Sequence, residues 1–434
     1  MGAFFAGLRA GLPVRFVAAL RFVGVFFVRT AVLRVGVRFA GLRAGARRVE
    51  PFRVVRLAGI VSPRGHPGRS RGHPATSGGP PGGNHYASGV ARIEDERPTP
   101  QPAHVRPVAR WRLALTTGNA PPGATDPVTR WLVLARASVL PMTVTAGLLA
   151  LLLAWWNDSG HVDVGLGVLA VAGIVLAHVA NNLMNDLWDL EVGTDSSQYP
   201  RALYAPHPVL SGMTTRRGLL ARVLVVNLLD LGILVALVAA RDAWILAFAL
   251  GGFVLSVAYT APPLRLKKRG LGELTVFVVW GPLMVGGTYY AAVGHLPVDV
   301  VLASIPYALL CTAVLMGKHI DKIPWDARDG TRTLPVVLGE RRARRLTQVM
   351  MLAFYPIVVG LAVAGTMPIL SVLCLLGITR LVRIWGPFSR PKPDAPPSGF
   401  PIWPLWFAAL AFVHTRRAGA LLVAGLLLGV LLGV

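Results

Sequence analysis

The chain has 434 residues, of which 54% are hydrophobic and only 15% carry a charge, and this balance excludes an ordinary soluble globular protein. Its formal net charge is +24, but the basic residues lie between apolar runs and not on one soluble basic domain, which argues against a nucleic-acid partner. Both cysteines, Cys311 and Cys374, fall within apolar runs, so no disulfide framework is expected.

The first 130 residues form a basic, Pro-, Gly- and Arg-rich extension ahead of the first long apolar run. Residues 60–130 have the composition of a disordered segment. Residues 1–60 allow three interpretations: an amphipathic segment on anionic lipid, a targeting segment, or a start codon annotated too early, which we favour. The membrane domain is expected to cover residues 131–434.

Apolar runs long enough to cross a bilayer follow one another through the rest of the chain. About 20 residues in a helix span the roughly 30 Å of hydrocarbon. Such runs extend from Ala137 to Trp156 and from Val164 to Asn185, and others begin near Val223, Ala243, Leu274, Val300, Leu346, Thr366 and Ala418. The segment Phe400–Val413 is too short to cross and is expected to lie at the interface or to dock as a half-helix. The sequence therefore predicts an all-α integral membrane protein, a bundle of about nine transmembrane helices.

The charges between the runs predict the orientation. The segments after the even-numbered runs hold twenty-two Lys and Arg, including Arg416 and Arg417, whereas those after the odd-numbered runs hold Arg241 alone. Because basic loops stay in the cytoplasm, the amino terminus is predicted to be cytoplasmic and the carboxyl terminus outside. A multi-pass protein of the plasma membrane is expected.

A first acidic segment, residues 181–195, ends the second run. If the helix continues to about Leu190, four polar residues spaced by three and four positions share one face; these are Asn182, Asn185, Asp186 and Asp189. Carboxylates gathered in this way repel one another unless a cation lies among them. Mg²⁺ is commonly held by one or two carboxylates while substrate phosphates complete its shell. The alternative is a solvated helix end.

A second acidic segment, residues 317–334, follows the sixth run and is predicted to open on the same face. Asp321 and Asp326 could bind a metal, and Lys322, Arg328 and Arg332 could bind phosphate. An ordinary charged loop is the alternative. Two facing carboxylate clusters that hold metal ions would suit an enzyme that grips a diphosphate and stabilises it as a leaving group.

A third segment, residues 259–273, leaves the fourth run and enters the fifth. Its prolines end the helix. Its cations, among them Lys267, could neutralise phosphate or anchor the loop to anionic lipid. The ring of Tyr259 could shield a carbocation or simply pack at the interface.

Two polar positions lie within the runs. Asp230, with Asn227 one turn before it, lies in the third run, and His178 lies in the second. A carboxylate at such depth faces a bundle interior or a cavity. Hydrogen bonding between helices is the favoured interpretation for Asp230, and a polar core contact for His178.

From Arg136 to the carboxyl terminus the chain resembles the UbiA-type membrane prenyltransferase superfamily. Asn185-Asp186-Leu187-Trp188-Asp189 is similar to the first Asp-rich motif, and Asp321 with Asp326 to the second. Family members often place a third first-motif Asp where this chain has Gly193, with Asp195 two residues later. This variant, with Asn182 before it and residues 259–273 behind, most resembles the branch that prenylates 1,4-dihydroxy-2-naphthoate for menaquinone. Arg136 and residues 207–212 also fit.

The resemblance implies a nine-helix fold in which Mg²⁺ holds a polyprenyl diphosphate beside an aromatic acceptor. It assigns the metal to Asn185, Asp186, Asp189, Asp195, Asp321 and Asp326, with Asp189 and Asp321 as the catalytic residues. Substrate contacts fall to Arg136, Asn182, Arg201, Tyr259, Lys267 and Lys322. Membrane lipid is the remaining partner, and no nucleic acid is expected.

The chain also departs from the branch that it resembles. Lys318, His319 and Ile320 stand where the branch has paired Asn and an Arg. The step from Asp321 to Asp326 is one residue longer than usual. A phosphosugar, a glycerol phosphate lipid or another quinone precursor therefore remains an alternative acceptor. A membrane transporter is the alternative from another functional class.

Overall fold

The computed structural model describes residues 106–120, 126–191 and 207–434, and the regular structure of these residues is helical. Residues 1–105 lie outside this description, and so do the predictions for residues 1–60. Two short helices, α3 (Pro107–Thr117) and α4 (Pro127–Leu134), precede the bundle. The helices of the bundle are α5 (Leu140–Asp158), α6 (Val164–Glu191), α8 (Arg216–Ala240), α9 (Ile245–Thr260), α10 (Gly272–Val278), α11 (Met284–Val293), α12 (Val298–Asp321), α15 (Glu340–Val363), α16 (Ile378–Ser389) and α17 (Trp406–Leu432).

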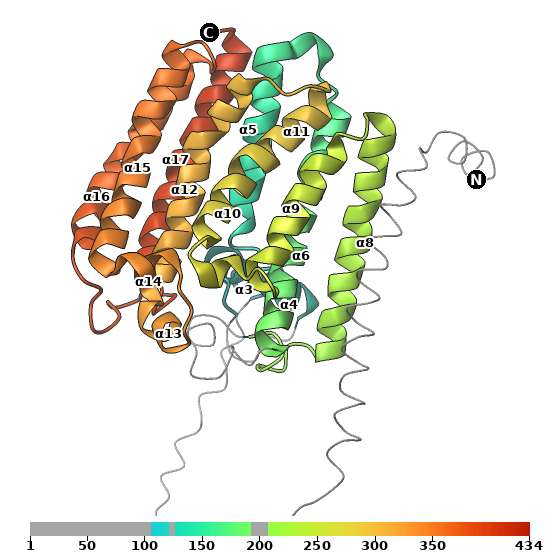
Figure 1. Cartoon of the computed structure of the whole chain (residues 1–434). Coiled ribbons are helices and arrows are strands. Elements are labelled where there is room, and N and C mark those ends of the chain that lie inside the picture. Colours follow the sequence, from blue (N-terminus) through green and yellow to red (C-terminus); the bar gives the residue numbers. More distant parts are fainter. Residues whose placement is uncertain (1–105, 121–125, 192–206) are drawn as a thin grey trace, which may run out of the picture. The chain divides into compact units, whose positions relative to one another are not determined.

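The predicted nine-helix bundle is confirmed. Eight helices in the described part are long and apolar enough to cross a membrane, counting α10 with α11 and α16 with the 3₁₀ turn before it as single spans. The ninth, α9, has 16 residues and is shorter. Successive helices run in alternating directions, so the carboxyl ends of α6 and α12 lie at the same end of the bundle, opposite the carboxyl terminus of the chain (Figure 1).

Helix α12 is the most enclosed of the spans, because 67% of its apolar 18-residue stretch is buried inside the protein. Its side chains Tyr307, Leu310 and Met316 are almost inaccessible to solvent. Near its carboxyl end, Gly317 lets the backbone of α17 come close: a Cβ there would lie 2.7 Å from the carbonyl carbon and oxygen of Phe407. Small residues permit such approaches between membrane helices. The contact places the second acidic segment against the first turn of α17.

The fifth span is irregular at Pro282. Proline has no N–H for the i→i−4 ladder, and here residues Val279–Leu283 form a π-helical turn between α10 and α11. The π-turn contacts α12. Its Trp280 ring packs edge-on to the imidazole of His178 in α6, with the ring centroids 5.1 Å apart.

The prediction of a short, separate segment at Phe400–Val413 is wrong. Helix α17 begins at Trp406 and is continuous to Leu432, so Arg416 and Arg417 lie within a helix and not in a loop. The polar residues that suggested a break have partners: His414 Nε2 lies 2.8 Å from the Tyr355 hydroxyl, and the Thr415 hydroxyl donates to the Leu310 carbonyl at 3.1 Å.

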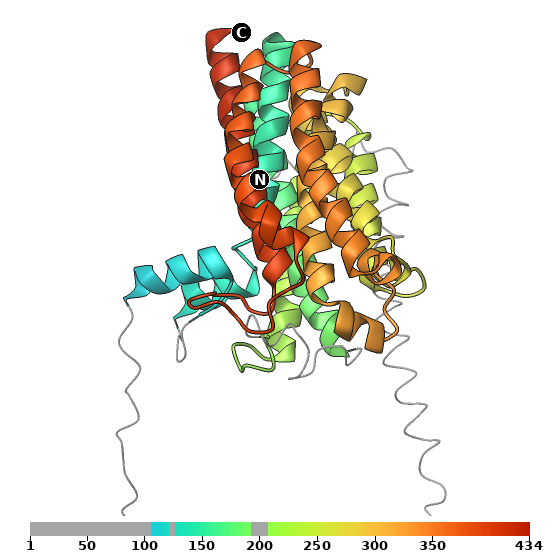
Figure 2. The same cartoon turned by 90° about the vertical axis from the view of Figure 1, so that its left-hand side faces the viewer.

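The prediction of an unstructured extension through residue 130 is wrong for residues 107–117, which form α3. Asp126 joins α3 to α4, because it caps α4 through the Thr129 N–H at 2.8 Å and accepts from the Trp111 indole at 3.1 Å. The Arg110 guanidinium lies 3.3 Å from the same carboxylate. The hydrogen bonds from Thr129, chiefly that from its hydroxyl, lower the pKa of Asp126 from 3.8 to about 2. Helix α3 projects sideways from the lower part of the bundle and runs crosswise to the long helices (Figure 2).

Candidate active site

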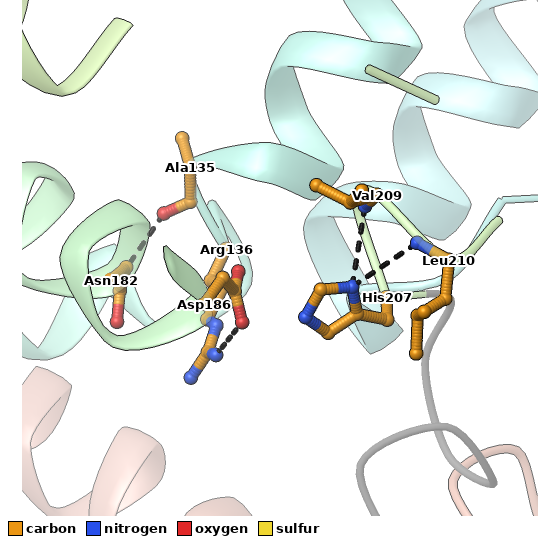
Figure 3. A network of polar contacts seen from close by, with 7 residues as sticks. All are labelled: Ala135, Arg136, Asn182, Asp186, His207, Val209 and Leu210. Carbon is orange, nitrogen blue, oxygen red and sulfur yellow. Dashed lines mark hydrogen bonds and ion pairs between the residues drawn. The ribbon is translucent and has the colours of Figure 1, made fainter. Parts of the chain in front are cut away.

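Residues 181–191 of the first acidic segment form the last three turns of α6, which ends at Glu191, close to the predicted Leu190. Asp186 is fully buried, and its Oδ1 forms an ion pair with Nη2 of Arg136, from the connection between α4 and α5 (Figure 3). One turn earlier, the buried Asn182 donates its amide N–H to the Ala135 carbonyl at 3.2 Å. A buried carboxylate needs such a partner, because leaving water costs a charge far more than a neutral group. The sequence placed Arg136 and Asp186 in one site, and the structure brings them into contact.

Arg136, which makes this contact, has an unusual backbone conformation. Its φ is +51°, in the left-handed region, where a residue with a Cβ loses roughly 1–2 kcal/mol. Strain of this kind persists where the surroundings hold it in place. Here the ion pair with Asp186, and the hydrogen bond of Asn182 to the preceding residue, fix the connection on α6.

His207 begins the segment 207–212, which the resemblance singled out. It is buried, and its Nδ1 accepts hydrogen bonds from the backbone N–H groups of Val209 and Leu210 at 3.2 and 3.3 Å (Figure 3). Nδ1 therefore carries no proton in this arrangement. The imidazole holds the turn that leads into α8, so its observed contacts are structural.

Asp321 occupies an unexpected position. Its carboxylate, 1% exposed, accepts hydrogen bonds from the first turn of α17: Oδ1 from the Phe407 N–H at 3.1 Å and Oδ2 from the Ala408 N–H at 2.9 Å. The sequence predicted Asp321 as a metal ligand and catalytic residue, and in the structure each of its carboxylate oxygens accepts a hydrogen bond at the positive end of a helix.

Lys322 and Asp326 form the second charge pair of the site. They lie at the end of α12 and in the short helix α13 (Ile323–Arg328), and Lys322 Nζ is 3.8 Å from Asp326 Oδ1. Both side chains are buried, with exposures of 4% and 1%. Arg328 and Arg332, also predicted to bind phosphate, are exposed.

A third buried pair was not predicted from the sequence. His319 Nδ1 lies 2.6 Å from Glu273 Oε1, and the two side chains are 1% and 2% exposed. The pair joins α12 to α10. His319 was noted only as a departure from the family pattern, and Glu273 only as the end of a loop. A single acidic residue at the start of an apolar run is the signal that could have indicated the contact.

The loop between α9 and α10 brings Tyr259 and Lys267 together. Gly272 makes this possible, since a Cβ there would lie 3.1 Å from the Tyr259 ring and 3.3 Å from the Lys267 Cα. The same loop contacts the chain beyond Asp326, where the Arg332 N–H donates to the Lys268 carbonyl at 3.2 Å. The predicted phosphate-binding cations of this loop therefore lie at the same end of the bundle as both acidic segments.

Asp230 and Asn227 lie in α8, away from these contacts. Asp230 faces α6, because a Cβ on Gly173 would be 3.5 Å from its Oδ1. Asn227 donates to the Val223 carbonyl of its own helix at 2.7 Å. His178 Nδ1 lies 2.7 Å from the Thr143 hydroxyl, which agrees with the core contact favoured from the sequence.

The described residues do not by themselves complete a metal site. Among them, no three His, Cys, Asp or Glu side chains gather closely enough to hold an ion. Asp186 and Asp326 have the oxygen donors that Mg²⁺ prefers, and each lies beside a basic side chain. Asn185 is half-buried on the face of α6 that carries Asp186. Only the backbone of Asp189 is described, and Asp195 and Arg201 lie outside the described residues.

Comparison with known proteins gives a consistent result. The model of the UbiA prenyltransferase family matches residues 142–408. The 1,4-dihydroxy-2-naphthoate octaprenyltransferase of Escherichia coli is 30% identical over 218 residues, which make up 50% of this chain and 70% of that protein. The enzyme of the same name from Mycobacterium tuberculosis is 30% identical over 263 residues, 57% of this chain and 81% of its own.

The structural comparison agrees on the fold. The apo structure of a UbiA homolog from Aeropyrum pernix K1 superposes with a TM-score of 0.50 at 16% identity, over 67% of this chain and 98% of that one. The family match covers every bundle helix from α6 to α16. This chain belongs to the UbiA prenyltransferase family and is a membrane-embedded prenyltransferase.

Proposed function

We propose that the protein transfers a polyprenyl group from its diphosphate to 1,4-dihydroxy-2-naphthoate, in a reaction of menaquinone biosynthesis that requires Mg²⁺. One observation carries the proposal: two ion pairs, the partly buried Arg136–Asp186 and the buried Lys322–Asp326, lie at the same end of the bundle as the cationic loop of Lys267. The names of the relatives from Escherichia coli and Mycobacterium tuberculosis support this choice of acceptor.

The basic members of the pairs are the groups that would receive the diphosphate. Arg136 and Lys322 each lie beside one carboxylate. An incoming diphosphate would be a second anion that each of them can contact. Lys267, and Arg201 from outside the described residues, add positive charge. Arg suits this role because its planar fork can bind two phosphate oxygens at once. Asn182 holds the Arg136 connection in place.

The side chains of Asn185, Asp186 and Asp326 would hold Mg²⁺. Asp189 and Asp195 would complete this ligand set. When bound, Mg²⁺ would neutralise negative charge on the diphosphate. Asp189 is the residue to which we assign the central catalytic role. Donors fixed at a site where charge develops stabilise the transition state more than the ground state.

The allylic C1–O bond breaks, and diphosphate leaves with the bonding electrons. A ring carbon of the acceptor then bonds to C1 and loses its proton to a base. Loss of the acceptor's carboxylate as CO2, with a proton taking its place, gives the prenylated naphthoquinol. The Tyr259 ring, packed near Lys267, would face the positive charge that develops on the prenyl group. Removing one fixed contact to the leaving group should cost about 2.7–4 kcal/mol, a hundredfold to thousandfold in rate.

We further propose that the site opens on the cytoplasmic face of the plasma membrane, with the amino terminus inside. The distribution of Lys and Arg supports this orientation, because the end of the bundle that carries the acidic segments also carries the basic loops. The opposite end has Arg241, whose Nε donates to the Ala291 carbonyl at 2.7 Å.

The test incubates membranes from an overexpressing host with a polyprenyl diphosphate, Mg²⁺ and a panel of acceptors led by 1,4-dihydroxy-2-naphthoate. Mass spectrometry reads the lipid products. Asp189→Ala is compared with Asp329→Asn, which changes an exposed carboxylate just beyond the second pair. A chelator should abolish the reaction, and added Mg²⁺ should restore it.

A prenylated naphthoquinol that requires both Mg²⁺ and Asp189 would support the whole proposal. Product formed only with another acceptor, such as a phosphosugar or a glycerol phosphate lipid, would retain prenyl transfer and reject the menaquinone assignment. The absence of both product and released diphosphate with every acceptor would refute the proposed reaction.

A further inference from the structure

We propose that Asp321 is a positioning residue, which fastens the end of α12 to the first turn of α17, and that it is not a ligand of the catalytic metal. The inference rests on the proposed function in one respect: the site that it positions is the diphosphate site of the prenyl transfer. The hydrogen bonds that carry it do not depend on that reaction.

The first step is the geometry of the helix end. The first N–H groups of any α-helix have no partner within the helix. At the start of α17, Leu405 stands at the N-cap and offers no side-chain hydrogen bond. Asp321 supplies the missing acceptors from another helix, through its bonds to Phe407 and Ala408 at 3.1 and 2.9 Å.

The second step is the electrostatic environment of the carboxylate. It faces the amino end of α17, which carries partial positive charge. Lys392 adds a full charge nearby, since its Nζ lies 3.4 Å from the Asp321 carbonyl oxygen and 3.4 Å from that of Pro404. A divalent cation at this carboxylate would meet these positive groups, whereas in the structure each carboxylate oxygen accepts a backbone hydrogen bond.

The third step is the set of contacts around Lys392. Its Nζ lies 5.8 Å from the ring centroid of Trp325 and 5.4 Å from that of Trp403. Trp325 belongs to α13 and Trp403 to the segment before α17, so one ammonium group joins both to the end of α12. The end of α12, α13 and the segment before α17 are thereby linked through Asp321, Lys392, Trp325 and Trp403.

The consequence concerns the charge pair of the site. Lys322 directly follows Asp321, and Asp326 lies one turn beyond in α13. Fixing the end of α12 therefore fixes the place where the Lys322–Asp326 pair begins. Asp321 acts on the reaction through Lys322, the residue next to it, so the loss of its cap should lower kcat by displacing that ammonium group. Asp326 is held from beyond α13 as well, where the Thr331 N–H donates to its carbonyl at 2.8 Å, so the metal affinity should be retained.

The experiment compares Asp321→Asn, Asp321→Ser and Asp321→Ala with Asp326→Asn. Asn and Ser can still accept one N–H bond at a helix start, whereas Ala cannot. Three quantities are measured on the full chain in detergent: the thermal unfolding temperature without substrate, the kcat of prenyl transfer, and the Mg²⁺ concentration at half-maximal prenyl transfer. The shift of unfolding temperature caused by Mg²⁺ with a polyprenyl diphosphate provides a binding readout that needs no turnover.

We expect the unfolding temperature to be highest for the wild type, lower for Asp321→Asn and Asp321→Ser, and lowest for Asp321→Ala. In these variants kcat should be lowered, and the Mg²⁺ concentration at half-saturation should be unchanged. Asp326→Asn should instead raise that half-saturation by at least about tenfold. The inference is overturned if Asp321→Asn raises it as much as Asp326→Asn does, or if Asp321→Ala unfolds at the wild-type temperature. If Asp321→Ala does not fold, the Asp321→Asn and Asp321→Ser variants provide the test. If the wild type transfers no prenyl group, the proposed function fails, and the unfolding series still tests the cap.

Discussion

The Arg136–Asp186 pair permits the sharpest prediction about the stability of the site. Arg136→Ala removes the guanidinium group from a carboxylate that is 0% exposed, while the Arg136 side chain itself is 18% exposed. Breaking a buried pair by removing one partner typically costs about 3–5 kcal/mol. Because Arg136 is partly accessible to water, we expect the lower end of this range, about 3 kcal/mol.

The backbone of Arg136 supplies an internal control. Both Arg and Ala carry a Cβ at φ +51°, and Gly does not. Arg136→Gly loses the same ion pair but relieves the left-handed strain, so it should be more stable than Arg136→Ala by roughly 1 kcal/mol. Adding Asp186→Asn to Arg136→Ala removes the buried charge and should recover much of the loss, though not the activity.

The assay is equilibrium unfolding of the purified variants in mixed micelles, followed by tryptophan fluorescence and read as a double-mutant cycle. Asp329→Asn, at an exposed position, serves as the matched charge control. Additive losses in the double variant would show that the two side chains do not interact. Equal stability of the Gly and Ala variants would refute the argument from strain.

Three further predictions concern contacts away from this pair. Gly317→Ala should lower stability by about 1–3 kcal/mol, because the new Cβ would meet the backbone of α17 at 2.7 Å. Glu273→Ala should cost about 1–3 kcal/mol by removing the buried acceptor of His319. The contribution of Asp126 to the docking of α3 on α4 should be complete above about pH 4 and decline as the pH falls toward 2, because the folded-state pKa lies below the ordinary value of 3.8.

Each of these has a measurement and a contrary result. Thermal unfolding of Gly317→Ala is compared with Gly360→Ala, where a Cβ meets nothing within 4 Å; equal unfolding temperatures would contradict the close approach. For Glu273, the Gln variant should be more stable than Ala, and a reversed order would contradict the hydrogen bond. The Asp126 prediction is tested by the rate of proteolysis of the α3–α4 region between pH 2 and 5. The same pH profile in Asp126→Ala would contradict the prediction.

The spans could be predicted from the sequence because each is a long apolar run. In the described part of the chain, eight spans and the shorter α9 lie at the predicted runs, although α17 begins before Ala418. The error at Phe400–Val413 has a clear cause. His414, Thr415 and the two following arginines look like a boundary, yet the first two form hydrogen bonds with neighbouring helices. Whether a polar residue interrupts a membrane helix depends on a partner that is distant in the sequence.

The sequence by itself determined the fold class, the two acidic segments and their common end of the bundle, because these follow from local hydropathy, helical spacing and alternating helix direction. The tertiary structure alone decided the partner of each charge. Asp321 and Asp326 look equivalent in the sequence, but one caps a helix that begins 85 residues later and the other pairs with Lys322. That difference arises from packing between α12 and α17, and a carboxylate takes its role from whichever positive group the fold brings to it.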